Sequence, residues 1–250
     1  MDIFLLVLLT LAGICVGSFC NVLIYRIPKG EEFVVTHSHC MECGNRLAWY
    51  ELIPVVSWLI QGGKCRHCKA KLSVQYPIVE AANGILWLLT GIIFQGDWER
   101  IILYSAVTSI LLVISVIDWR TFEIPNGLNL ALLILGIIQV ILDYENWPLY
   151  VIGMVSVGLV FLLLNLATGG NGLGMGDVKL VGAAGLLFGW QKMILGIFVG
   201  CVAGIIIHSI RMKRGAGRKL AFGPYLSAGI WFAAMFGDPL IRAYLGLFGL

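Results

Sequence analysis

Apolar segments long enough to cross a lipid bilayer recur along the whole chain. A helix needs about 20 apolar residues to span the hydrocarbon core of a bilayer. Of the 250 residues, 59% are hydrophobic and only 12% are charged, which is unusual for a soluble domain. The sequence therefore predicts an all-α polytopic membrane protein. We expect about eight transmembrane helices, over residues 3–26, 77–95, 99–117, 127–142, 148–167, 178–189, 191–211 and 222–236.

The first and sixth of these segments, and a further apolar stretch after the eighth, differ from the others. The first has no basic residues before it and no cleavage-like break after it, so we expect a membrane helix rather than a signal peptide. The sixth is short and flanked by glycines. The last stretch, 239–249, is too short to span and is expected to lie at the membrane interface.

Lys and Arg residues are distributed unequally between the two faces that these helices define. Of the 17 basic residues, all except Arg100, Lys192 and Arg242 fall on one face. Because basic loops are retained in the cytoplasm, we expect this face to be cytoplasmic and both termini to lie on the other. The net charge of +3 is spread through loops near the membrane, where anionic lipid explains it. We therefore expect lipid contacts and no nucleic-acid partner.

One loop, residues 27–76, is long enough to fold. It contains two cysteine pairs, Cys40 with Cys43 and Cys65 with Cys68, in the pattern C-x2-C-x21-C-x2-C. Four thiolates at such spacing can close a tetrahedral structural zinc site. A loop of about fifty residues has too little core to hold itself, and metal binding would supply the missing folding free energy. The pattern predicts a zinc-binding loop domain.

Two disulfides, or an iron centre of rubredoxin type, are the alternatives for these four cysteines. A cytoplasmic location disfavours disulfides, because thiols there are kept reduced. His37, His39 and His67 lie nearby and are expected to be loop residues rather than ligands. The remaining cysteines lie inside apolar segments and are expected to pack there: Cys15, Cys20 and Cys201.

Asp118 and Asp177 lie where apolar segments meet short loops. A carboxylate at membrane depth is costly, which makes it a candidate functional residue. The charge distribution places both residues at cytoplasmic ends, of the third and sixth predicted helices. Two carboxylates that face each other can share a proton and perform acid–base chemistry on one bond. Taken alone, Asp118 is equally well explained as an interfacial carboxylate.

The neighbours of both aspartates strengthen the functional interpretation. Residues 123–126 (Glu-Ile-Pro-Asn) are expected to end one helix and begin another. Residues 169–176 contain five glycines in eight positions and would let a substrate strand or partner helix approach Asp177. This stretch lacks the G-K-[ST] ending of a phosphate-binding loop. Lys179 is expected to be an interface lysine.

Further motifs surround these residues, in one order along the chain. They are Gly-Ser-Phe-Cys-Asn-Val-Leu-Ile-Tyr-Arg-Ile-Pro at 17–28, Trp-Tyr-Glu-Leu-Ile-Pro-Val-Val-Ser at 49–57, Gly-Lys-Cys at 63–65, Tyr-Pro-Ile-Val-Glu at 76–80, Asp118 with Ile-Pro-Asn at 124–126, Gly-Met-Gly-Asp-Val-Lys-Leu at 174–180, Gly-Trp at 189–190 and Phe-Gly-Pro-Tyr at 222–225. Together they closely resemble the type 4 prepilin leader peptidase family, the bifunctional enzymes of type IV pilus, type II secretion and competence systems.

The resemblance implies a membrane aspartic protease of the G-x-G-D class in the bacterial inner membrane, with Asp118 and Asp177 as its catalytic pair. Such enzymes cut the short basic leader from prepilins and pseudopilins after a glycine, at the cytoplasmic face. They then methylate the new N-terminal residue with S-adenosylmethionine. By this resemblance, residues 1–95, which include the cysteine loop, serve methyl transfer, and residues 96–250 form the peptidase core.

The methyltransferase half rests on fewer residues. Glu80 is a candidate base, or an anchor for the cationic N-terminus, although a capping or snorkelling role explains it equally well. The family usually has proline after the first loop cysteine and asparagine before the Ile-Pro of the loop, where this chain has Met41 and Leu52. No glycine-rich motif of soluble methyltransferases is present, so S-adenosylmethionine is implied by resemblance alone.

Other functions are compatible with parts of the pattern. The chain could be a peptidase without methyltransferase activity. A proton- or cation-coupled transporter would use paired aspartates, but it predicts inverted repeats and carboxylates at mid-bilayer, and neither is visible. A membrane-anchored zinc or redox module would make the four cysteines the active centre. Its function would survive loss of Asp118.

Overall fold

The structure is a computed structural model that describes residues 2–170, 172–215, 217, 219–247 and 249. Three residues mentioned above lie outside the described residues: Asn171 of the glycine-rich stretch, Arg218 among the basic residues, and Phe248 of the apolar tail. The chain folds into two compact units, residues 1–113 and 114–250.

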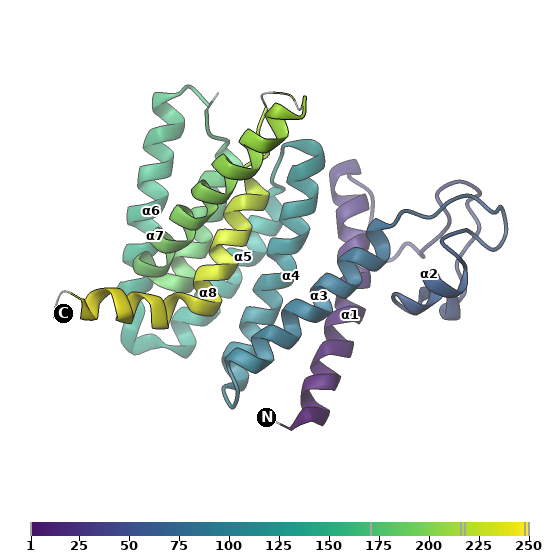
Figure 1. The fold of residues 1–250 in the computed structure, drawn as a ribbon, viewed down its shortest axis with the longest axis horizontal. Coiled ribbons are helices and arrows are strands. Elements are labelled where there is room, and N and C mark those ends of the chain that lie inside the picture. Colours follow the sequence, from purple (N-terminus) through teal and green to yellow (C-terminus); the bar gives the residue numbers. More distant parts are fainter. Residues whose placement is uncertain (1, 171, 216, 218, 248, 250) are drawn as a thin grey trace. The chain divides into compact units, whose positions relative to one another are not determined.

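Within the described residues the regular structure is helical, and the only β-type pairings are two isolated bridges. This confirms the predicted all-α fold. Three 3-10 helices, η1 (Ile27–Lys29), η2 (Trp49–Leu52) and η3 (Tyr144–Asn146), accompany the α-helices. The α-helices are α1 (Ile3–Arg26), α2 (Val56–Ile60), α3 (Gln75–Ile93), α4 (Trp98–Thr121), α5 (Asn126–Leu142), α6 (Trp147–Ala167), α7 (Met175–Lys213) and α8 (Gly223–Gly246) (Figure 1).

Five of the described helices, α1, α3, α4, α6 and α7, are long and apolar enough to cross a membrane. Helix α5 is apolar but has only 17 residues. The sixth and seventh expected spans together make up α7, which is interrupted at Gly189 (φ 74°, ψ 169°). Residues with a Cβ rarely adopt this backbone conformation, so the glycine allows two helical segments to meet there.

Two expected boundaries were wrong by a helical turn or more, and a third by three residues. Helix α4 continues through Asp118 to Thr121, and α7 begins at Met175, so both aspartates lie inside helices rather than beside them. Helix α8 runs on to Gly246 and contains Pro239, instead of ending at residue 236. Figure 1 shows α8 bending toward its C-terminal end, as expected for a helix with an internal proline.

In the first unit, α1 packs closely against α3. A Cβ at Gly17 would lie 2.8 Å from the Cα of Glu80, so the two backbones approach within a distance that only small residues permit. The amide of Asn83 donates a hydrogen bond of 2.7 Å to the carbonyl of Gly13 and accepts one of 2.9 Å from Ser109. Buried polar groups therefore tie these helices together.

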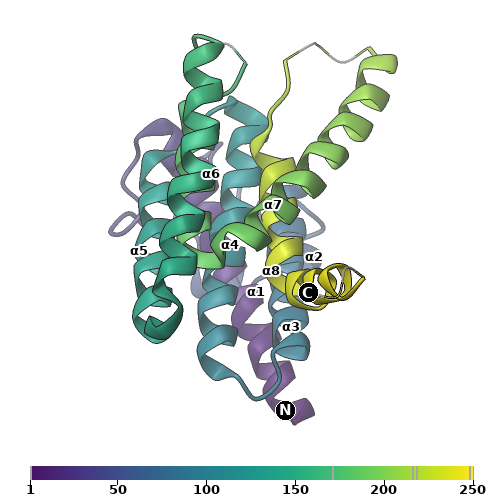
Figure 2. The ribbon, with the colours of Figure 1, turned by 90° about the vertical axis from the view of Figure 1, so that its left-hand side faces the viewer.

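In the second unit, α7 contacts α5, α6 and α8 (Figure 2). Its first segment packs on α6, where a Cβ at Gly153 would lie 2.5 Å from the carbonyl oxygen of Gly185. Its second segment packs on α8, where a Cβ at Gly200 would lie 2.8 Å from the carbonyl oxygen of Tyr225. These contacts fix the start of α7 and the start of α8 within one packed unit.

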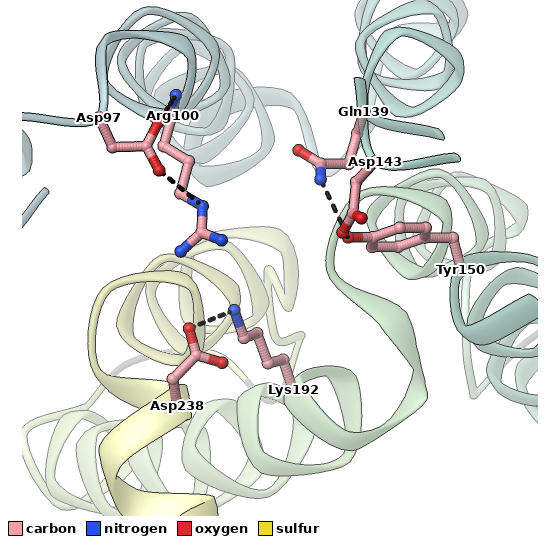
Figure 3. Close-up of polar contacts among 7 residues, drawn as sticks. All are labelled: Asp97, Arg100, Gln139, Asp143, Tyr150, Lys192 and Asp238. Atoms are coloured by element: carbon pink, nitrogen blue, oxygen red, sulfur yellow. Dashed lines mark hydrogen bonds and ion pairs between the residues drawn. The ribbon is translucent and has the colours of Figure 1, made fainter. Parts of the chain in front are cut away.

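Polar side chains fix helices at three places (Figure 3). The first two contacts lie at helix ends, and the third joins the interiors of α7 and α8. The contacts are the ion pair of Asp97 with Arg100, the chain from Gln139 through Tyr150 to Asp143, and the ion pair of Lys192 with Asp238.

Candidate active site and metal centre

Asp118 is buried in the last turn of α4, with 5% of its surface exposed. Its Oδ2 accepts a hydrogen bond of 2.8 Å from the backbone N–H of Gly223, the first residue of α8. A Cβ at Gly223 would lie 2.8 Å from the same oxygen. Glycine at this position therefore allows the start of α8 to approach the carboxyl group.

Asp177 lies in the first turn of α7, where its Oδ2 accepts a hydrogen bond of 3.3 Å from the backbone N–H of Gly174. Each aspartate thus accepts a backbone N–H at the start of a helix, where the helix dipole favours negative charge. The other oxygen, Oδ1 of Asp177, is buried and has no hydrogen-bond partner among the described residues. One oxygen of this carboxyl group remains available to a ligand or a water molecule.

The second unit brings the two predicted aspartates together. Their carboxyl groups are close enough for the charge of Asp118 to act on Asp177. The pair is formed by the C-terminal end of α4 and the N-terminal end of α7. This arrangement can hold one proton between two carboxyl groups and present both to a single bond.

The loop between α4 and α5 and the first turn of α5 pack against the start of α7. The amide of Asn129 donates a hydrogen bond of 3.2 Å to the carbonyl of Gly176. Lys179 donates one of 2.7 Å to Oδ1 of Asn126. A Cβ at Gly176 would lie 2.9 Å from the Cβ of Ile124. The glycine therefore permits a contact that fixes the register of Asp177 relative to α4.

Basic side chains lie over aromatic rings near Asp118. The guanidinium of Arg211 stands 4.2 Å from the ring centre of Trp119, and the ammonium of Lys219 stands 4.6 Å from that of Phe122. Cation–π contacts of this kind stabilise by about 0.5–1 kcal/mol at exposed sites. They hold the end of α7 and the segment before α8 against the end of α4.

In the first unit, the cysteine loop forms two turns of the same geometry. The carbonyl of Cys40 accepts the N–H of Gly44 at 2.8 Å, and that of Cys65 accepts the N–H of Lys69 at 3.0 Å. Gly44 (φ 69°) and Lys69 (φ 63°) both adopt the left-handed conformation. The two isolated bridges, His39 with Arg46 and Lys64 with Lys71, close the turns.

These turns direct four sulfur atoms toward one point. The Sγ atoms of Cys40, Cys43, Cys65 and Cys68 all lie within 4.8 Å of one another, and the Cys40–Cys68 pair is 3.8 Å apart. Tetrahedral zinc with Zn–S bonds of 2.3 Å would separate its sulfur ligands by about 3.8 Å. All seven cysteines are free thiols, so the disulfide alternative is not formed. The cluster fits a metal ion.

Two cysteines of the cluster differ in pKa. Backbone N–H groups of Cys68 and His67 lower the pKa of Cys65 to about 6. A backbone hydrogen bond from Ala70 lowers the pKa of Cys68, but desolvation and the neighbouring thiols outweigh it and raise the value to about 11. Four thiolates cannot accumulate at one point without a compensating cation, which a divalent metal would supply.

Two of the histidines near the cluster, His37 and His39, have other partners. Among the described residues the metal-binding group contains only the four cysteines. Nδ1 of His37 lies 3.2 Å from the guanidinium of Arg46, and Nδ1 of His39 lies 3.2 Å from the carbonyl of His37.

Glu80 is buried in α3, and its Oε2 accepts a hydrogen bond of 2.7 Å from the backbone N–H of Val55. Val55 has φ 63° and ψ −54°, and the N–H of Val56 bonds to the carbonyl of Pro54 at 2.6 Å. This is a classic γ-turn, a strained conformation for a branched residue. Glu80 therefore fixes a strained turn of the loop domain.

Glu80 also lines a cavity of about 320 Å³ in the first unit. Its wall includes Glu51 and Trp58 of the loop domain. Neither these two residues nor Gly223 was singled out for a chemical role from sequence. Each lies in one of the motifs quoted above, and that placement was the only signal available.

Comparison with known proteins identifies both halves of the chain. Residues 11–94 match the family described as Bacterial Peptidase A24 N-terminal domain. Residues 105–209 match the Type IV leader peptidase family. No solved structure matches the chain significantly.

Several curated relatives are called prepilin leader peptidase/N-methyltransferase. The protein from Stutzerimonas stutzeri is 34% identical, covering 93% of this chain and 91% of the relative. That from Pseudomonas aeruginosa is 34% identical, covering 96% and 93%. That from Neisseria gonorrhoeae is 33% identical, covering 92% and 90%. The chain, an integral inner-membrane protein, therefore belongs to the prepilin leader peptidase/N-methyltransferase family.

Proposed function

We propose that this protein removes the short basic leader from prepilins and pseudopilins, after a glycine, and then methylates the new N-terminal residue with S-adenosylmethionine. The observation that carries the peptidase half is the pairing of Asp118 with Asp177, each accepting a backbone N–H at the start of a helix. Membership of the family supports both halves.

In the proposed reaction the two aspartates act as one unit. Two carboxylates held near each other cannot both ionise cheaply, so one keeps its proton. The ionised carboxylate takes a proton from water as the water oxygen attacks the scissile carbonyl carbon. The protonated carboxyl group polarises the carbonyl oxygen and later gives its proton to the leaving amine. Because the pair titrates together, neither role is assigned to one residue.

The methyl-transfer half is assigned to residues 1–95, and the peptidase core to residues 96–250. The four cysteines, the cavity and Glu80 all fall in the first region, and both aspartates fall in the second. Bound S-adenosylmethionine supplies an electrophilic methyl group, which an unprotonated amine can attack. Glu80 is proposed to serve this step either as a base or as an anchor for the cationic N-terminus. Its hydrogen bond to Val55 also favours a positioning role.

We assign the metal to zinc, held by Cys40, Cys43, Cys65 and Cys68. Sulfur separations near those of a tetrahedral zinc site support this choice. All four positions would be filled by protein thiolates, so the ion is structural. It would stabilise a loop domain whose regular structure is confined to two 3-10 helices and the short helix α2.

The face that carries the cysteine loop and both aspartates is proposed to be cytoplasmic. The distribution of Lys and Arg supports this orientation. A reporter enzyme that is active only in the periplasm tests it. Fused after Gly96 it should be active, and fused after Glu123 it should be inactive. The reverse pattern would invert the orientation.

Incubation of the purified protein with a synthetic prepilin, followed by intact-mass analysis, tests the function. The leader should be lost, and the mature product should gain about 14 Da, the mass of one methylene, only when S-adenosylmethionine is present. Cleavage without the gain would leave a peptidase alone. Absence of cleavage would contradict the proposal and would favour the alternative of a proton- or cation-coupled transporter.

A further inference from the structure

We propose that the cavity in the first unit is the binding site for S-adenosylmethionine, and that Glu51 and Trp58 are its polar contacts. This inference rests on the proposed methyl-transfer activity and adds its location and recognition residues. The cavity has a volume of about 320 Å³, within the range of small-molecule sites. It is lined by residues of α1, the loop domain and the start of α3.

Glu51 has an unsatisfied oxygen. The side chain is 7% exposed, and its Oε2 accepts a hydrogen bond of 2.9 Å from the backbone N–H of Ala48. Its Oε1 is buried and has no partner among the described residues. An unpaired buried carboxylate oxygen is destabilising unless a ligand or water completes its hydrogen bonds. Because Glu51 lines the cavity, the missing donor would come from the occupant.

Trp58 provides the complementary group. Its indole Nε1 is buried and, in the described part of the chain, has no acceptor. A Cβ at Gly63 would lie 2.8 Å from the indole Cζ2, so glycine there allows the ring to pack on the turn that leads into Cys65. The occupant must therefore present a donor to Glu51 and an acceptor to Trp58.

The charge of the wall favours a cation. Its carboxylates are Glu42, Glu51 and Glu80, and its cationic side chains are Arg26 and Lys71, so acidic groups are in excess. The guanidinium of Arg26 is moreover engaged by the carbonyls of Glu32, Thr36 and His37. S-adenosylmethionine carries a sulfonium and an ammonium cation. Its adenine amine and ribose hydroxyls are donors, and its ring nitrogens are acceptors. Apolar and aromatic side chains complete the wall, including Val22, Tyr25, Leu72 and Tyr76. These suit an adenine ring.

Direct binding to the full-length protein in detergent tests the inference, with radiolabelled S-adenosylmethionine as the probe. We expect Glu51→Gln to raise the Kd at least about tenfold, because the amide can still accept from Ala48 but turns a donor toward the cavity. Trp58→Phe, which keeps a ring and removes the N–H, should raise the Kd about three- to tenfold. Glu31→Gln is the matched control, because Glu31 is exposed and lies outside the cavity wall. Its Kd should equal that of the wild type.

Zinc content and leader cleavage, measured on each variant, report whether the fold is retained. If Glu51→Gln loses zinc, its loop domain is no longer intact, and the Kd of Trp58→Phe tests the inference instead. Unchanged S-adenosylmethionine binding in both variants would overturn the inference while leaving the methyltransferase function in place. The inference would also be overturned if a variant bound the probe normally but had a raised KM for cleaved pilin, since the cavity would then hold the peptide. A wild-type protein that neither binds the probe nor methylates would refute the proposed function as well.

Discussion

The backbone N–H of Gly223 donates a hydrogen bond of 2.8 Å to Oδ2 of Asp118, across 105 positions of sequence. The start of α8 therefore sets the position of a carboxyl group carried by α4. Its geometry depends on a glycine, because a side chain on residue 223 would occupy the space of the carboxylate. We expect proteolysis to depend on Gly223 even though it has no side chain to contribute.

Gly223→Ala should reduce leader cleavage at least tenfold, equivalent to about 1.4 kcal/mol in the activation free energy. The added methyl group would lie 2.8 Å from Oδ2 of Asp118 and displace it. Gly246→Ala is the matched control on the same helix, since a Cβ there meets nothing within 4 Å. Rates of prepilin cleavage measure the effect. Equal rates for Gly223→Ala and the wild type would show that this contact does not position the carboxyl group.

Gly176→Ala should impair cleavage and spare the metal site. The new Cβ would lie 2.9 Å from the Cβ of Ile124 and push the loop between α4 and α5 away from α7. Gly182→Ala, one to two turns further along α7, adds its methyl group in open space and should be neutral or slightly stabilising. Cleavage and zinc content should be compared in both variants. Similar losses in both would indicate a general effect on α7 instead.

Cys65→Ser should reduce the zinc content of the purified protein well below one ion per chain. Oxygen from serine is a poor replacement for a thiolate, and the loop domain loses the ion that stabilises it. We expect methylation to fall more than cleavage. Cys201 lies on α7 and is not one of the four clustered cysteines, so the control variant Cys201→Ser should keep its zinc. Elemental analysis measures the zinc content of both variants. Full zinc content in Cys65→Ser would exclude a four-thiolate site.

Metal retention should depend on pH in a defined direction. Zinc binds thiolates, so protons compete with the ion for the four cysteine sulfurs as the pH falls. Backbone N–H groups of Cys68 and His67 lower the pKa of Cys65 and so favour its thiolate. Zinc release to a colorimetric chelator should be low from pH 7 to pH 8 and should increase as the solution is made more acidic. If zinc release did not change between pH 8 and pH 4, the assignment of the cysteines as ligands would be contradicted.

The helices were predictable because apolar length is a strong signal in a membrane protein, whereas their ends were not. Asp118 was expected beyond its helix, but α4 continues to Thr121, whose hydroxyl bonds back to the carbonyl of Ile117. The break at Gly189 was visible only as a short span flanked by glycines. Local sequence does not reveal which helical ends stop at a polar residue and which continue past it.

Both aspartates could be singled out from sequence as candidate functional residues because carboxylates at membrane depth are rare. Their supporting contacts were not identified. The bond from Gly223 to Asp118 and the bond from Val55 to Glu80 join residues far apart in sequence, and only packing brings them together. The cysteine cluster was predictable because two C-x2-C turns have a local geometry of their own, with Gly44 and Lys69 in the left-handed conformation.

The central claim is that Asp118 and Asp177 together cleave the leader. The most direct measurement is the cleavage of a synthetic prepilin, followed by intact mass, by the wild type and by Asp118→Asn and Asp177→Asn. Asp97→Asn is the control, because Asp97 lies in the turn between α3 and α4 with 42% of its side chain exposed. We predict that the wild type and Asp97→Asn remove the leader, and that both other variants leave it intact while keeping their zinc. Cleavage that persists in both Asp118→Asn and Asp177→Asn would contradict the account.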